Sequence, residues 1–207
     1  MDPILTHEVE GYRVNVELDQ TPTFSPRDEY DNLGTFFGFH GRYRSPDTPP
    51  DSEPAAAARI ACNRDNLCLP VWLYDHSGTS YRAAEKNPFH CPWDSGLFGF
   101  VYVSKAKVRA EYGVKRITAK TRQKALDVLA SEVRVYSDWA NGNVYCYRVI
   151  DPDGEEVDSC FGFIGDAEGA LQEGASVARA MAGVAPYVHI QTGKGGNPVY
   201  VAPPVGA

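Results

Sequence analysis

The feature that most restricts the fold of this chain is a change of hydrophobic period after residue 105, where a short helix closed by Gly113 precedes a longer one. Before it, apolar residues come in short runs, many with a period of two, which is typical of strands with one buried face. After it, apolar residues recur at spacings of three and four, the period of an amphipathic helix: Leu126, Leu129, Val133 and Tyr136. We predict a helix over residues 118–142, with Thr118 as its N-cap and Asn141-Gly142 as its end.

Strand patterns fill much of the remaining chain. Four runs before the helix are alternating or rich in β-branched and aromatic residues: 11–19, 32–44, 67–78 and 96–105. After the helix, two alternating runs flank the turn residues 151–154 and predict a hairpin. Strands and helices do not alternate regularly, which disfavours a doubly wound parallel sheet. The sequence therefore predicts an α+β fold, an antiparallel β-sheet with two or three helices packed on one face, in a single domain.

Composition divides the chain into a core and an extension. We expect an α+β core domain over residues 1–165, because the strand patterns and the strongest helix lie there. Residues 166–207 begin with an Ala/Gly-rich helical pattern and are expected to pack on that core. Within the core, residues 46–54 hold four prolines and three acids, which predicts a flexible Pro/acidic loop over 46–58.

Other global features exclude several classes of protein. The 207 residues are 43% hydrophobic, which is enough to fill a core. No run of about 18 apolar residues is present, so we expect no membrane-spanning helix, and the first residues do not resemble a secretory signal. The five cysteines are an odd number and favour free thiols in a cytosolic protein. No motif predicts a cofactor; Gly-Lys-Gly-Gly at 193–196 lacks the spacing of a phosphate loop.

Charge is unevenly distributed along the chain. Residues 104–124 contain eight basic residues and one acidic residue, a charge of +7. The whole chain carries −7, so the rest carries −14. This composition argues against general coating of nucleic acid, which favours a basic chain. It predicts instead one basic face on an acidic body.

The basic residues near the start of the predicted helix are the strongest candidates for binding. Cations are disfavoured at a helix N-terminus by about 0.3–1 kcal/mol each, and the free N–H groups there favour anions. Such a cluster is explained if an anion or an acidic partner surface binds to it, although a solvated helix face is an alternative. The candidate binding residues are Lys115, Arg116, Lys120 and Arg122.

The stretch Pro88–Ser95 concentrates residues that could carry chemistry. A metal site would draw on His76, His90, Cys91 and Asp94, but no pair has the spacing typical of zinc ligands. A Cys91 nucleophile with His76 or His90 as its base is a second alternative. We interpret the stretch mainly as a turn, in which Pro92 fixes the backbone and Trp93 buries its ring as an anchor.

Two aromatic turns complete the candidate binding surface. One contains Tyr74 and His76 at the end of a predicted strand, and the other contains Trp93 and Asp94. Asp75, His76 and Ser77 include the residue types of a hydrolase triad, but neighbours along a strand do not converge on one another.

Several blocks resemble a family of accessory proteins encoded by tailed bacteriophages and prophages. The resemblance covers roughly residues 30–165 and rests on NLGTFFGFHGRYR, LPVWLYDHSGTS, CPWDSGLFGFVYVSK, VRAEYGVKRIT and VLASEVRVYSDWANGNVYCYRVIDPDGEEVDSCFGFIG. The chain departs from the family in the insert at 46–54 and in the extension after Gly165. No catalytic residue is transferred by this resemblance.

The resemblance implies a protein made in the cytoplasm of an infected bacterium, outside the virion machinery. By analogy with such proteins, we expect it to act by binding, either inhibiting a host defence protein or sequestering an anionic nucleotide signal. The alternative is a metal- or cysteine-dependent hydrolase acting on a nucleotide or a protein. A homo-oligomer is compatible with either hypothesis.

Overall fold

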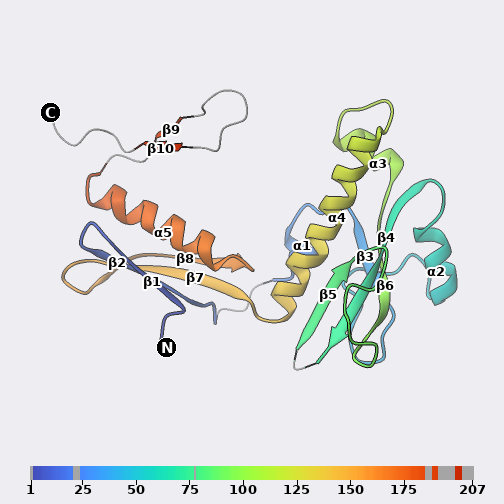
Figure 1. The fold of residues 1–207 in the computed structure, drawn as a ribbon, viewed down its shortest axis with the longest axis horizontal. Coiled ribbons are helices and arrows are strands. Elements are labelled where there is room, and N and C mark those ends of the chain that lie inside the picture. Colours follow the sequence, from blue (N-terminus) through green and yellow to red (C-terminus); the bar gives the residue numbers. More distant parts are fainter. Residues whose placement is uncertain (1, 21–23, 77, 185–187, 191–198, 202–207) are drawn as a thin grey trace. The chain divides into compact units, whose positions relative to one another are not determined.

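The computed structural model describes residues 2–20, 24–76, 78–184, 188–190 and 199–201. In these residues, helices and antiparallel strands are both abundant, so the predicted α+β class is confirmed (Figure 1). The sequence predicted one sheet, whereas the described strands form two four-stranded sheets and one two-stranded sheet. Contacts divide the chain into two compact units, which we call unit 1 (1–21 with 144–207) and unit 2 (22–143).

Unit 2 is an antiparallel sheet in the order β3-β6-β4-β5. Its strands are β3 (Thr35–Gly38), β4 (Asn66–Asp75), β5 (Thr79–Ala83) and β6 (Ser95–Ser104). Its helices are α1 (Pro26–Glu29), α2 (Pro54–Ala61), α3 (Lys105–Glu111) and α4 (Ala119–Ala140). The long helix predicted over 118–142 is confirmed, with Thr118 as N-cap and Asn141 as C-cap.

The two faces of the unit 2 sheet are covered by different helices. Alternate residues of β4 point to α4, where Leu67, Val71 and Leu73 join Phe36 of β3 in the main core. On the other face, Ala57 and Ala61 of α2 pack against Phe37 and neighbouring aromatic rings. The strict alternation of β4 therefore separates a large core under α4 from a smaller one under α2.

The segment 46–58 is more ordered than the sequence predicted. A helix, α2, begins at Pro54, and the prediction of a loop is wrong from there to residue 58. The helix forms because Pro54 occupies its first turn, Glu53 caps it and four alanines with high helix propensity follow. Earlier in the segment, Asp47 pairs with the buried Arg27 at 2.6 Å.

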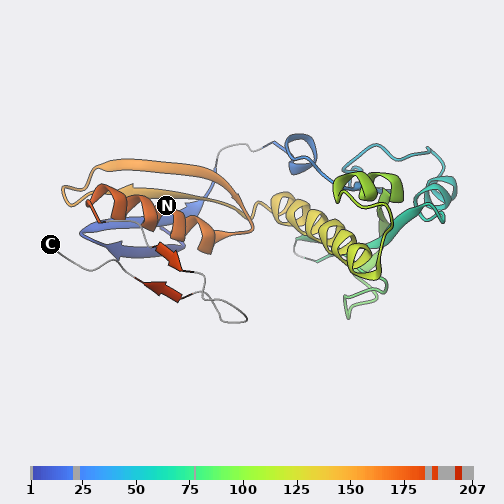
Figure 2. The ribbon, with the colours of Figure 1, turned by 90° about the horizontal axis from the view of Figure 1, so that it is seen from above.

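Unit 1 is an antiparallel sheet in the order β1-β2-β7-β8, with α5 along one face (Figure 2). The elements are β1 (Leu5–Val9), β2 (Tyr12–Leu18), β7 (Val144–Ile150), β8 (Glu156–Ile164) and α5 (Ala167–Met181). A separate pair consists of β9 (Val188–Ile190) and β10 (Val199–Val201). The predicted hairpin is confirmed as β7–β8.

The core of unit 1 lies between α5 and its sheet. Val14 and Val16 of β2 and Val149 of β7 are fully buried against small residues of α5 such as Ala178. The domain boundary expected at residue 165 differs from the observed division, because α5 packs on β2 and β7 within the same unit. Its alanines and glycine allow the helix to approach the sheet closely.

Candidate functional site

The basic residues of 104–124 form an exposed surface on α3, on the loop after it and on the start of α4. We call this the basic surface and define it by Arg109, Lys115, Arg116, Lys120 and Arg122. Within the described part of the chain, none of these five side chains makes an ion pair or a hydrogen bond. Their charges are therefore uncompensated.

The remaining basic residues of this window have structural partners. Lys105 Nζ donates to the carbonyl of Arg64, and Lys107 Nζ donates to the carbonyl of Asn32 at 2.8 Å. Lys124 lies over the ring of Tyr112, with its Nζ 4.8 Å from the ring centroid. These three residues support the fold, in contrast to the five of the basic surface.

A cavity of about 310 Å³ lies at the start of α4, beside the basic surface. Lys105, Arg109 and Arg122 line it together with Thr118 and Ala119. The first turn of α4 contains no acidic residue, and Thr118 Oγ1 accepts a hydrogen bond from Thr121 N at 3.2 Å. The cavity therefore combines three cations with the positive end of a helix.

The sequence identified only part of this cavity. Arg122 was a predicted binding residue and lines the cavity, whereas Lys115, Arg116 and Lys120 do not. Arg109 and Lys105 belong to the basic segment 104–124 but are not among the predicted binding residues. The sequence contains a signal for these two residues, because Lys105 and Arg109 are four residues apart and therefore lie on one side of the helix α3.

A second candidate region lies where β4 ends and β6 begins. Tyr74 stacks on Phe89 with ring centroids 5.3 Å apart, and Trp72 Nε1 donates to the carbonyl of Ala84 at 3.0 Å. These contacts hold the chain between β5 and β6 against β4. Trp93 is 92% exposed, so the expectation that it buries its ring as an anchor is wrong. The stack of Tyr74 on Phe89 serves as the anchor of this turn instead.

The structure brings three of the four alternative catalytic residues together. Asp94 Oδ2 lies 3.2 Å from Cys91 Sγ and 3.5 Å from His76 Nδ1. The carboxylate is thus between the thiol and the imidazole, so the direct contact of a nucleophile with its base is absent from this cluster. His90 is exposed, and its side chain has no hydrogen bond or ion pair among the described residues.

Groups of three or more His, Cys, Asp or Glu side chains that could hold a metal ion do not occur among the described residues. The five cysteines are free thiols. Burial and the neighbouring thiol of Cys62 raise the pKa of Cys68 well above its ordinary value. At neutral pH the Cys68 side chain is therefore a protonated, poorly nucleophilic thiol.

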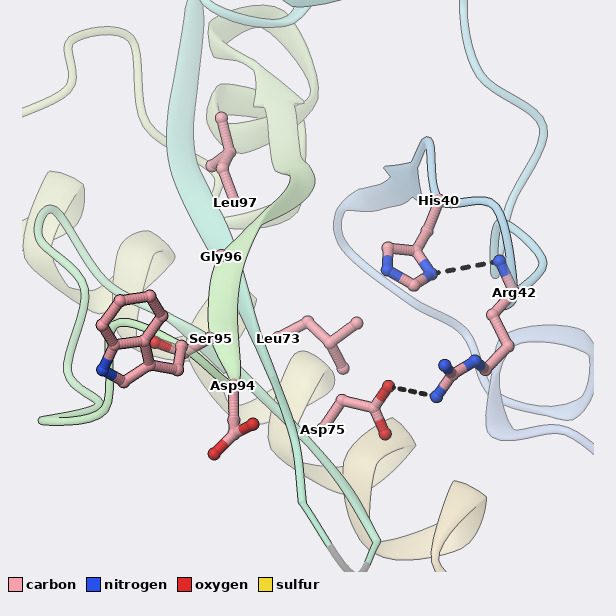
Figure 3. A pocket seen from close by; sticks show the side chains of 9 residues that line it. His40, Arg42, Leu73, Asp75, Asp94, Ser95, Gly96 and Leu97 are labelled. Atoms are coloured by element: carbon pink, nitrogen blue, oxygen red, sulfur yellow. Dashed lines mark hydrogen bonds and ion pairs between the residues drawn. The ribbon is translucent and has the colours of Figure 1, made fainter.

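A cavity of about 360 Å³ adjoins Trp93, and we call it the β6-edge cavity (Figure 3). His40 and Arg42 form one wall, and Asp94, Ser95 and Gly96 belong to the opposite one. Both side chains of the first wall come from the loop after β3, so the predicted strand over 32–44 ends earlier, at Gly38.

The first wall of the β6-edge cavity is held by a polar network. Arg42 Nη1 donates to Asp75 Oδ2 at 2.7 Å, and the Tyr43 hydroxyl donates to Asp75 Oδ1 at 2.8 Å. The ring of His40 stacks on Tyr43 at 5.1 Å, and its Nδ1 accepts from the Arg42 N–H. The loop is therefore preorganised, although the Arg42 side chain remains 70% exposed.

Comparisons with protein-family models, with curated proteins and with solved structures each found no match for this chain. None of the described helices combines the length and the apolar character needed to cross a bilayer. The functional conclusion therefore depends on the geometry of the two surfaces and on the resemblance described above.

Proposed function

We propose that this protein acts by binding, and that an anionic partner docks on the basic surface. The observation that carries this proposal is the set of five exposed basic side chains without a carboxylate partner, beside the N-terminus of α4. Elsewhere in unit 2, Arg27 and Arg42 are each paired with a carboxylate, whereas Arg59, Lys86 and Arg134 are exposed and have no ion pair among the described residues. The basic surface differs from these scattered cations because its five members lie within one short segment, next to the N-terminus of α4.

The physical basis is the cost of the arrangement in the absence of a partner. Cations in the first turn of a helix are disfavoured by the helix dipole by about 0.3–1 kcal/mol each. Lys120 and Arg122 occupy this turn of α4, and Lys115 and Arg116 precede it. A bound anion offsets this cost, because it is attracted both to the cations and to the helix N-terminus and accepts hydrogen bonds from the free N–H groups.

The resemblance to bacteriophage accessory proteins suggests the biological context. The protein would be made in the cytoplasm of an infected bacterium and would counter host defence there. Its partner would be an acidic surface of a host defence protein or an anionic nucleotide signal. In both cases it would act by occupying its target rather than by transforming it.

The structure offers a way to separate these two partners. The cavity of about 310 Å³ lined by Lys105, Arg109 and Arg122 would take a phosphate group, whereas Lys115 and Arg116 lie outside this lining. Arg109→Ala should therefore weaken the binding of a nucleotide more than the binding of a protein. Changing Lys115 and Arg116 to Glu should weaken the binding of an extended acidic protein surface more than the binding of a nucleotide.

The test is affinity capture from infected bacteria, with bound proteins and small molecules identified by mass spectrometry. The bait variants are the unmodified chain, a variant with Arg116, Lys120 and Arg122 changed to Glu, and a control with Arg59, Lys86 and Arg134 changed to Glu. The control has the same net charge and alters exposed residues outside the basic surface.

We expect the unmodified chain and the control to recover the same anionic partner, and the first variant to lose it. Binding should weaken as salt rises from about 50 to 300 mM, because exposed charges are screened. A variant at the basic surface that keeps the same partner with the same salt dependence would disprove the proposal.

A further inference from the structure

We infer that the free edge of β6 binds an extended peptide segment of a partner protein by strand addition. The pairing of β3 with β6 extends only to Gly38 opposite Gly99, followed by a hydrogen bond from Phe39 N to Phe98 O at 3.0 Å. On its other side, β6 pairs with β4 as far as Ser95. Among the described strands, none pairs with Ser95–Leu97 on the side that β3 leaves.

The other edges of the same sheet are closed by hydrogen bonds. On β5, Tyr81 N donates to Ser137 Oγ at 3.0 Å, and Thr79 exchanges bonds with the Asn141 side chain. On β3, Phe36 N donates to Asp47 Oδ2 at 2.7 Å, and its carbonyl accepts from Asp47 N at 2.9 Å. Covering an edge in this way prevents pairing with another chain.

The edge at Ser95–Leu97 lies in the β6-edge cavity, where a narrow chain has room. Figure 3 shows Gly96 on β6 with His40 and Arg42 on the side of β3. A Cβ built on Gly96 would have no neighbour within 4 Å, so another main chain can approach this residue closely. A peptide there would continue the line of β3 and would hydrogen-bond to β6.

The walls of the cavity define the peptide's chemistry. Successive side chains of a strand point to opposite faces. Leu97 is 53% exposed, and Trp93, which lines the same cavity from the turn before β6, is 92% exposed; both would contact apolar side chains. On the opposite wall, Arg42 keeps N–H groups beyond its bond to Asp75, and they would pair with an acidic side chain. The two carboxylates of the cavity already have partners, because Asp75 accepts from Arg42 and Tyr43, and Asp94 lies against Cys91 and His76. The peptide therefore carries an acidic residue, which would meet the N–H groups that Arg42 keeps, between two apolar residues.

The concave shape favours a peptide over a second copy of this chain. Two β6 edges could pair only if the loop with His40 and Arg42 moved aside, because this loop flanks the edge. Main-chain hydrogen bonds supply affinity in strand addition, and side-chain contacts supply specificity. This inference concerns a site separate from the basic surface and does not depend on the proposed function.

The test is an NMR titration of the full isotope-labelled chain with acetyl-Thr-Val-Glu-Val-Thr-amide, up to about 5 mM. We expect saturable shifts of the Ser95–Leu97 amides and of the Trp93 indole N–H. The same peptide with Lys in place of Glu should bind at least about tenfold more weakly. Arg42→Glu should reverse this preference.

Two N-methylated peptides test for main-chain pairing. In one peptide, the backbone nitrogens of both valines are methylated. In the other, only the backbone nitrogen of the glutamate is methylated. Because alternate N–H groups of a strand face the same edge, one of these peptides should lose binding and the other should keep it. Loss with both, or with neither, would overturn strand addition.

Further outcomes separate this site from others. The variant with Arg116, Lys120 and Arg122 changed to Glu should bind the peptide normally. Shifts confined to α3 and α4, or no saturable shift, would overturn the inference. Concentration-dependent shifts at Ser95–Leu97 without peptide, together with dimer formation in sedimentation, would assign the edge to a second copy instead.

Discussion

Arg27 and the basic surface show two opposite environments of positive charge within unit 2. The Arg27 side chain is only 3% exposed and pairs with Asp47 at 2.6 Å and Glu132 at 3.2 Å. It also donates to Asn32 Oδ1 and to the carbonyl of Gly34, both at 2.7 Å. The five residues of the basic surface are exposed and have no such partners in the described part of the chain. The buried charge of Arg27 is enclosed by acceptors, whereas the charges of the basic surface stay exposed.

The Arg27 cluster links segments that are far apart in the sequence. Glu132 of α4 also accepts from the backbone N–H groups of Leu33 and Gly34. Asp47 accepts from Phe36 N, next to the loop that carries His40 and Arg42. These carboxylates therefore fix the strand that leads to the β6-edge cavity.

The largest expected effect is from breaking the Arg27 cluster. Arg27→Met should lower the free energy of unfolding of unit 2 by about 3–5 kcal/mol, because two carboxylates lose their buried partner. Urea denaturation followed by circular dichroism measures this. The matched variant Arg134→Met changes an exposed arginine of α4 and should cost less than about 0.5 kcal/mol. Equal losses in the two variants would contradict the distinction.

Changing the basic surface should raise the free energy of unfolding, whereas breaking the Arg27 cluster should lower it. Arg116, Lys120 and Arg122 changed together to Glu should raise the stability of the free protein by about 1–2 kcal/mol, since acids are favoured near a helix N-terminus. The measurement is the same urea denaturation at low salt. A gain that disappears in about 1 M salt would confirm its electrostatic origin. A loss of stability would mean that these cations support the fold.

An exposed ion pair of unit 1 provides an intermediate case. Arg148 Nη1 lies 2.7 Å from Glu156 Oε2, and this contact lowers the pKa of Glu156. A lowered pKa contributes stability above the unfolded-state value, near 4.3, and the contribution is lost as pH falls through the folded-state value. Glu156→Gln should thus cost about 0.2–1 kcal/mol at pH 7 and nothing in strong acid. A difference independent of pH would contradict this account.

The smallest effect is expected at Trp93. Its ring is 92% exposed, so Trp93→Ala should change the free energy of unfolding by less than about 0.5 kcal/mol. The melting temperature measures this. Phe36→Ala is the matched control, since that ring is fully buried and should cost about 3–5 kcal/mol. A large loss of stability in Trp93→Ala would show that the Trp93 ring supports the fold.

The sequence predicted local helices and turns better than it predicted which distant strands pair with one another. The helix period after Thr118 and the hairpin around Asp151–Gly154 depend on neighbouring residues, and both predictions are confirmed. The pairing of β2 with β7 brings together strands more than a hundred residues apart, and no local pattern encodes it. In place of the one predicted sheet, the described strands form two four-stranded sheets and a two-stranded one.

The candidate sites show the same limit. The basic window follows from residue types alone, but the partners of Lys105 and Lys107 lie in Arg64 and Asn32, far away in the sequence. Trp93 was expected to be buried because large aromatic residues usually are. Its exposure follows from Tyr74 and Phe89, whose stacking already anchors the turn. The β6-edge cavity could not be predicted from the sequence, because it exists only where the pairing of β3 with β6 ends, at Gly38.

The pairing of β2 with β7 also has a consequence for synthesis on the ribosome. Leu18 lies opposite Tyr145, and the intervening residues include all of unit 2. At about 5–20 residues per second, β2 emerges roughly 6–25 s before its partner. During that interval the β1–β2 hairpin is at best marginally stable in water. Arg13, Asn15 and Glu17 keep part of the waiting strand polar, which protects the nascent chain from pairing with its neighbours on a polysome.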